Sequence, residues 1–194
     1  YTTLFRSTQV IINLHGGRLE YEYKSKRTLL GLPLIHINIG KGFKKAKGIV
    51  AIGNISYGIV SAGIISLGVL SFGCMSIGII SLAAISIALL LAIGAISIGV
   101  FSVGAISIGI FSLGALSIGK YSIGAAAIAT DVAIGDYAKG TVAIGNTTEG
   151  LTKIPLDTSI EDIKKVIKEQ YPSLSNWIIK YIEFFVKYTK FGVK

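Results

Sequence analysis

The chain has 194 residues, of which 52% are hydrophobic and 15% are charged, and its formal net charge is +9. Soluble domains usually carry about 25% charged residues, so this chain is less charged than they are, in the direction expected of a membrane-associated protein. The single cysteine, Cys74, excludes an intrachain disulfide and a thiolate metal cluster.

The charges are concentrated at the two ends of the chain. Residues 1–48 hold nine Lys and Arg against two acids, a net +7, whereas residues 49–150 carry a net −1 and residues 151–194 a net +3. No charged residue occurs from Ile49 to Gly119. Basic ends that flank an apolar middle favour an anionic membrane surface over nucleic acid as the partner.

The chain begins with the stretch "YTTLFRS", Tyr1 to Ser7, without a methionine. This stretch resembles the in-frame translation of a sequencing adapter at the start of a metagenomic reading frame. We therefore exclude residues 1–7 from the fold prediction.

Residues 8–47 are predicted to form a β-rich N-terminal cap. The run "VIINLH", then Gly16-Gly17, then "RLEYEYK" predicts a hairpin with a Gly-Gly turn. A further strand is predicted in "PLIHINIG", which Pro33 restricts to a strand start or a sheet edge. The cap ends in a basic cluster that suits anionic headgroups or, alternatively, a solvated loop, and it consists of Lys41, Lys44, Lys45 and Lys47.

Residues 48–150 repeat with a period of five: glycine, a variable residue, a large apolar residue, serine, and a second large apolar residue. Glycine recurs every five residues from Gly48 to Gly78, and Ala83 and Ala88 continue the register. One extra residue shifts the phase before Gly94, and a second shifts it before Gly135. A fixed period over such a length predicts a repeat architecture.

Two structures compete for this array. Membrane-spanning helices suit its hydrophobicity, but a five-residue step would scatter the glycines and serines over every face of a helix. Each glycine would also cost about 1 kcal/mol relative to alanine in a helix. A β-solenoid places a small residue at each corner and β-branched residues on the straight segments, which favours the solenoid.

The repeat resembles that of the pentapeptide-repeat family. The resemblance implies a right-handed, four-sided β-helix with about four repeats per coil. In the repeat Gly63 to Leu67 it implies that Gly63 and Ile65 face inward and that Ile64, Ser66 and Leu67 face outward. The tail "VAIGDYAKGTVAIGN" resembles Gly-rich "AIG" repeats of left-handed β-rolls, and the start of the array resembles uncharacterised bacterial proteins with such arrays.

Residues 151–194 are predicted to form a C-terminal cap of two helices. Asp157, Thr158 or Ser159 is expected to cap the first helix, and Ser173 or Ser175 the second. The apolar side of the second helix is expected to include Trp177, Ile178, Tyr181, Ile182, Phe185 and Tyr188. Trp177, Phe184 and Phe185 with nearby lysines also suit a helix at a membrane interface.

The sequence offers no set of residues typical of a catalytic site. His15 and His36 lack a surrounding cluster of metal ligands, and the serine ladder lacks a base. We therefore predict no catalytic residue, metal, cofactor, nucleic acid or small-molecule substrate.

The expected function is that of a structural β-solenoid, membrane-associated or self-assembling, in a bacterial protein. Its expected partner is membrane lipid or a second copy. The alternative is a polytopic α-helical membrane protein, such as a small channel or transporter subunit.

Overall fold

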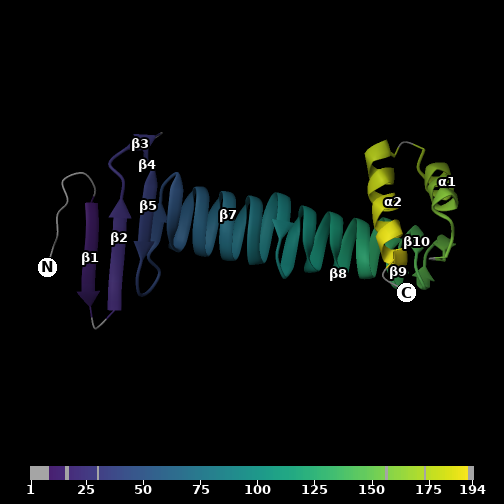
Figure 1. The fold of residues 1–194 in the computed structure, drawn as a ribbon, viewed down its shortest axis with the longest axis horizontal. Coiled ribbons are helices and arrows are strands. Elements are labelled where there is room, and N and C mark those ends of the chain that lie inside the picture. The colour runs from purple at the N-terminus through teal and green to yellow at the C-terminus, as the bar shows by residue number, and fades with distance from the viewer. Residues whose placement is uncertain (1–8, 16–17, 30, 156, 173, 192–194) are drawn as a thin grey trace. The chain divides into compact units, whose positions relative to one another are not determined.

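The computed structural model describes residues 9–15, 18–29, 31–155, 157–172 and 174–191 (Figure 1). Strands account for 68% of the described residues, and most of them form a β-solenoid of about 11 turns, with two helices after it, which confirms the predicted fold class. The chain divides into two compact units, unit 1 at Tyr1–Phe101 and unit 2 at Ser102–Lys194. The adapter-like residues 1–7 lie outside the described residues.

Unit 1 begins with the predicted hairpin. Strands β1 (Gln9–His15) and β2 (Arg18–Lys24) pair antiparallel, with Gln9 opposite Lys24 and His15 opposite Arg18. Two short strands follow, β3 (Thr28–Leu29) and β4 (Leu32–Pro33), and then β5 (Ile35–Ile39). Because β5 pairs antiparallel with β2 and parallel with β7, the hairpin extends one sheet of the solenoid.

The solenoid turns once every ten residues. Strand β6 (Lys45–Lys47) pairs in parallel with residues 55–57 of β7 (Val50–Ile93), so that Lys45 lies opposite Ile55. The backbone of Gly63 likewise stacks on that of Gly53, ten residues earlier. Each turn therefore holds two repeats, and the four-sided coil that the family resemblance implied is wrong.

The serines face the lumen of the solenoid. The serines at the fourth position of the repeat in unit 1 are each at most 1% exposed: Ser56, Ser61, Ser66, Ser71, Ser76, Ser81, Ser86 and Ser97. Ser76 and Ser81, from opposite sides of the turn, bring their hydroxyls into hydrogen-bonding contact across the lumen. The predicted outward position of Ser66 is therefore wrong, while the predicted outward position of Ile64 is confirmed by its 56% exposure.

The width of the lumen explains this inversion. Because two serine hydroxyls, those of Ser76 and Ser81, already meet across the lumen, we infer that the two sheets lie closer together than the roughly 10 Å between sheets packed through large side chains. Within residues 48–144 this position holds only serine or alanine, and Ala51 and Ala92 take the serine position with no exposed surface. Ile65 flanks Ser66 in the strand and therefore points outward, as strand alternation requires, although it was predicted to face inward.

The glycines permit the close stacking of successive turns. A Cβ built on Gly63 would lie 2.0 Å from the carbonyl oxygen of Gly53, and one on Gly73 would lie 2.1 Å from that of Gly63. Among the described glycines only Gly31 and Gly42 have a positive φ, and both lie in the N-terminal cap. Glycine is therefore needed in the array because another backbone lies against it rather than for its conformational freedom.

The two phase shifts are turns of eleven residues. Gly94 stacks on Ala83 in unit 1, and Gly135 stacks on Gly124 in unit 2, instead of on residues ten positions earlier. The first extra residue lies in the run Leu89-Leu90-Leu91, where Leu89 is 73% exposed. An extra residue that bulges outward leaves the lumen register intact, since Ala92 still occupies the serine position.

Unit 2 contains the rest of β8 (Ile96–Ile134), four short strands and both helices. The strands are β9 (Tyr137–Lys139), β10 (Val142–Ile144), β11 (Thr147–Glu149) and β12 (Thr152–Ile154), all paired in parallel. Serine continues to occupy the lumen as far as Ser122, and alanine replaces it after that, at Ala127, Ala133, Ala138 and Ala143. The helices are α1 (Ile160–Gln170) and α2 (Asn176–Phe191), joined by an ion pair between Lys164 and Glu183 at 2.7 Å.

Helix α2 packs against the wall of the solenoid within unit 2. The Phe111 ring lies 5.1 Å from that of Trp177 and 6.0 Å from that of Tyr181, between ring centroids. Phe111 in turn stacks on Tyr121 at 5.1 Å. Ile179, Ile182 and Val186 are also buried. The predicted apolar side of α2 therefore omitted Ile179 and Val186.

The polytopic helical alternative is wrong for the apolar array. Its residues form the long strands β7 and β8, in which successive turns satisfy the backbone hydrogen bonds. None of the helices in the described part of the chain has the length and apolar content that crossing a bilayer requires.

Ser159 is the N-cap of α1, one of the three residues expected there. Its hydroxyl accepts a hydrogen bond of 3.2 Å from the backbone N–H of Asp162. We expect Ser159→Ala to lower the free energy of unfolding of unit 2 by about 1 kcal/mol, since one N–H at the helix start loses its partner. Chemical denaturation of Ser159→Ala and of Ser159→Asp, which restores the cap, measures this effect. Equal destabilisation by both variants would contradict it.

Candidate functional site

Large apolar side chains cover both outer faces of unit 1. Face A comprises the repeats that begin at Gly58, Gly68, Gly78 and Ala88, and face B those that begin at Gly53, Gly63, Gly73 and Ala83. Exposed side chains on face A include Ile59, Val69, Phe72, Ile79, Leu82 and Leu89. Those on face B include Ile64, Met75, Ile77, Ile85 and Ile87. We call these two faces together the apolar wall.

The two faces point in opposite directions. The serines of face A and face B meet in the lumen, as the contact between Ser76 and Ser81 shows, so the flanking apolar residues point away from each other. Cys74 lies on face B and is exposed. A contiguous apolar surface of more than a few hundred Å² is rare on soluble monomers and marks an interaction site.

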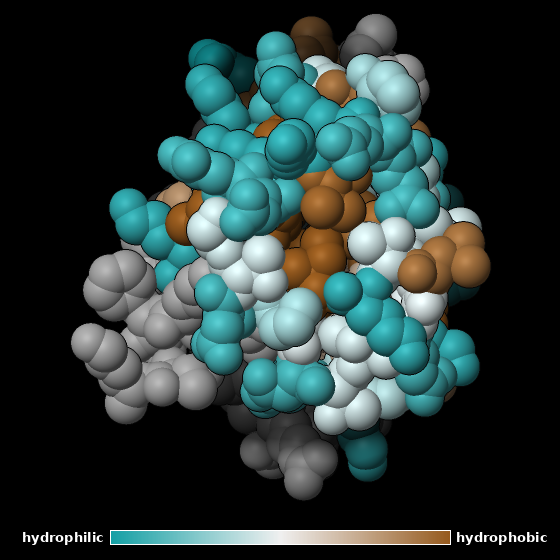
Figure 2. Space-filling view, turned by 90° about the vertical axis from the view of Figure 1, so that its right-hand side faces the viewer, coloured by the Kyte–Doolittle hydropathy of each residue, from teal (hydrophilic) through white to brown (hydrophobic). Residues whose placement is uncertain are grey.

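Unit 2 covers part of its own wall. Phe111 and Tyr121 are each only 7% exposed, because α2 places Trp177 and Tyr181 on Phe111. Seen from the side of the helices, the molecule presents many hydrophilic residues, with hydrophobic ones visible between them (Figure 2). Within unit 2 an apolar strand face is therefore covered by an apolar helix.

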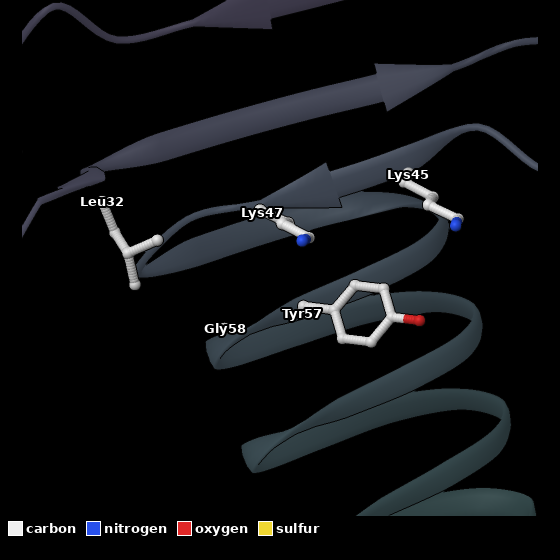
Figure 3. Close-up of a pocket in the computed structure, with 5 residues that line it drawn as sticks. All are labelled: Leu32, Lys45, Lys47, Tyr57 and Gly58. Carbon is white, nitrogen blue, oxygen red and sulfur yellow. The ribbon is translucent and has the colours of Figure 1, made fainter.

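The basic cluster borders the apolar wall. Lys45 and Lys47 lie on β6, which pairs with the first turn of β7, and with Leu32, Tyr57 and Gly58 they line a hollow of about 470 Å³ (Figure 3). The Lys47 ammonium lies 5.8 Å from the centre of the Tyr57 ring. Two ammonium groups beside a phenol and an apolar wall suit an anionic group at a lipid interface.

The other two lysines of the cluster lie apart from this hollow. Lys44 forms an ion pair with Glu20 of β2, with 3.2 Å between Nζ and Oε2. Lys41 is exposed in the loop between β5 and β6. The structure thus brings together Lys45 and Lys47, while Lys44 connects the loop to the hairpin.

His36 occupies a position that the sequence did not reveal. It pairs with Ala51, so its side chain stands first in a lumen column that otherwise holds serine and alanine. Its Nδ1 accepts a hydrogen bond of 2.9 Å from the backbone N–H of Lys47, and its Nε2 lies 3.5 Å from Glu22 Oε1. The register of β5 against β7 gives His36 a structural place at the start of the lumen. The side chain of His15 lies outside the described residues.

The three aromatic residues proposed for an interfacial helix differ in their surroundings. Trp177 is 49% exposed although it contacts Phe111, and Phe184 is 53% exposed. Phe185 packs against Tyr181, with ring centroids 4.8 Å apart. Only part of this aromatic surface therefore remains open to solvent.

Charged residues in unit 2 form local pairs. Lys120 lies 3.4 Å from Asp131, and burial together with Asp131 raises the pKa of the neighbouring Tyr121 hydroxyl. Lys139 lies 2.9 Å from Glu149. The hydrogen bond from Lys139, supported by one from Tyr137, lowers the pKa of the Glu149 carboxyl.

The lowered pKa of Glu149 predicts a pH dependence. Because the folded pKa lies below the unfolded one, the pairing stabilises unit 2 above the ordinary carboxyl pKa and is lost as the pH falls through the folded value. We expect Lys139→Met to return the pKa of Glu149 towards its ordinary value, as measured by NMR titration of the side-chain carboxyl. Lys153→Met is the matched control and should change it less, since Lys153 acts only through weak charge attraction. Equal shifts in the two variants would refute the assignment.

Among the described residues no group of three or more His, Cys, Asp or Glu side chains is placed to hold a metal ion. No family model, no curated protein and no solved structure matches this chain.

Proposed function

We propose that this chain is a structural β-solenoid that associates with membranes through the apolar wall of unit 1. The observation that carries the proposal is the exposure of large apolar side chains on both faces of unit 1, next to a cluster of basic residues. Burial of apolar surface contributes roughly 25 cal/mol per Å², which strongly favours covering such a wall.

The charges of unit 1 support lipid rather than a second copy as the covering partner. Residues 1–48 carry a net +7, and the remainder of unit 1 carries no charge. Copies packed side by side in the same direction would bring clusters of the same sign together, whereas anionic headgroups attract them by about 1 kcal/mol per lysine. Within unit 2 the apolar residue Phe111 is covered by α2, and the apolar wall of unit 1 needs an equivalent cover.

Flotation with vesicles tests this function. The chain is expected to float with zwitterionic vesicles through its apolar wall and more completely with vesicles that contain anionic phosphatidylserine. Replacing Lys41, Lys44, Lys45 and Lys47 together with glutamine should remove the preference for anionic vesicles and keep the basal binding.

The matched control replaces four exposed lysines of the helices, Lys165, Lys168, Lys180 and Lys187, by glutamine. This variant has the same net charge and should keep the preference. A chain that stays at the bottom of the gradient with both vesicle types would contradict the proposal. If that chain elutes as an oligomer in size-exclusion chromatography, the result would indicate that a second copy of the chain covers the apolar wall.

A further inference from the structure

The distribution of charge along unit 1 bears on how it would meet a membrane. Its charged residues all precede Gly48, and those in the described part of the chain lie on β2, on β6 and on the segments between them, whereas none occurs from Gly48 to Phe101. We propose that unit 1 enters lipid end-on, with its solenoid axis near the membrane normal and its β6 end at the headgroups. This inference rests on the proposed function and adds the orientation.

Both faces of unit 1 are suited to contact lipid. A protein that lies on a membrane surface has one apolar face and an opposite polar face that stays in water. Ile59 and Ile79 on face A are 45% and 41% exposed, and Ile64 and Ile77 on face B are 56% and 49% exposed. A flat orientation would leave one of these apolar faces in water, whereas an end-on orientation places both in lipid.

The backbone of unit 1 meets the requirement for lateral contact with lipid. A segment in hydrocarbon must satisfy its N–H and C=O groups internally. Strand β7 runs without interruption through 44 residues, corners included, because each turn bonds to the next. At one corner, for example, the N–H of Gly48 donates to the carbonyl of Tyr57 at 3.1 Å. Within β7, therefore, an unpaired strand edge can occur only at its first and last turns.

The length of the uncharged part of unit 1 suits this orientation. Residues 49–101 form about five turns, and strands stack at about 4.8 Å, which gives a depth of about 24 Å. The hydrocarbon core of a bilayer is about 30 Å thick. The next charged residue in the sequence is Lys120, so no charged turn interrupts the far end of unit 1.

Depth-dependent fluorescence quenching tests the orientation. A fluorophore is attached to native Cys74, or to one cysteine introduced at an exposed position in a Cys74→Ala background. The introduced cysteines are Ile64→Cys and Ala84→Cys on face B, and Ile59→Cys, Val69→Cys and Ile79→Cys on face A. Each labelled chain is bound to vesicles that carry nitroxides at a shallow or a deep position of the acyl chain. Circular dichroism confirms that each variant retains its strand content.

We expect the depth to increase by about 5 Å for every ten residues on both faces, in step with the strand spacing. Positions one repeat apart, such as 69 and 74, should lie at nearly equal depth. If the depth is constant along each face but differs between the two faces, unit 1 lies flat on the membrane. That result would overturn the end-on orientation and leave membrane association intact. Failure of the labelled chains to bind vesicles, or a label shielded from water but not quenched by either nitroxide, would overturn both.

Discussion

Replacing Ser66 with leucine is expected to unfold unit 1 under conditions in which the unmodified chain is folded. Ser66 has no exposed surface, and its hydroxyl lies 3.4 Å from where a Cβ would stand on Gly73. A leucine has no space in this lumen, and overpacking typically costs about 1–3 kcal/mol and occasionally more, with the larger cost expected where the backbones of successive turns are already in contact. Thermal denaturation followed by circular dichroism measures the effect.

Ser66→Ala is the matched control for the lumen. The Ser66 hydroxyl has no hydrogen-bond partner among the described residues, and alanine occupies the equivalent position at Ala92. Removing a buried hydroxyl that has no partner is neutral or stabilising. Ser66→Ala should therefore melt at or above the temperature of the unmodified chain. Tolerance of leucine together with destabilisation by alanine would show that Ser66 does not face the lumen.

Placing one lysine on each face of the apolar wall is expected to abolish vesicle binding without unfolding the chain. Ile64→Lys and Ile79→Lys change exposed second positions of the repeat, a position that Lys120 already occupies in unit 2. A lysine in the hydrocarbon costs about 2.5–3.5 kcal/mol, which weakens binding roughly 70- to 400-fold for each substitution.

The control for the lysine variants keeps the wall apolar. Ile64→Leu with Ile79→Leu should bind vesicles as the unmodified chain does, in the same flotation assay. Unchanged binding of the double lysine variant would place the membrane contact elsewhere. A double lysine variant that loses strand content would require the same test at Ile59 and Ile77, which are exposed on the same two faces.

The period of the sequence predicted the architecture but not which side chains face inward. Glycine every fifth residue is compatible with two or four repeats per turn, because both place the glycines in stacked columns. The number of repeats depends on how closely the two sheets approach, which the three-dimensional packing decides. The pentapeptide-repeat family has four repeats per turn, and the resemblance to it therefore predicted, wrongly, that Ile65 faces inward.

One signal in the sequence distinguishes the lumen. From Gly48 to Ile144 the fourth position of the repeat holds only serine or alanine, as at Ser86 and Ala92, whereas the third and fifth positions vary widely in size, from alanine to tyrosine. Uniform small size indicates a confined position, and varied size indicates an open one. Hydrophobicity alone suggests the opposite assignment, because large apolar residues are usually inside.

The candidate site was partly visible in the sequence. The four lysines of the basic cluster were found from their spacing, but the register of β6 against β7, which places Lys45 and Lys47 beside Tyr57, was not. The place of His36 in the lumen depends in the same way on the register of β5 against β7. These pairings join residues ten and fifteen positions apart, but β5 and β6 precede Gly48, the first glycine of the array, so the glycine period does not mark their register.

The reactivity of Cys74 tests the central claim most directly, because it needs no substitution and Cys74 is the only cysteine in the chain. A water-soluble maleimide should modify the folded chain readily without vesicles, since the thiol lies outside on face B. Vesicles should slow this reaction at least tenfold, because lipid covers the apolar wall. If the chain floats with vesicles but Cys74 reacts as fast as before, lipid does not cover the apolar wall. If Cys74 does not react even without vesicles, the wall does not face outward.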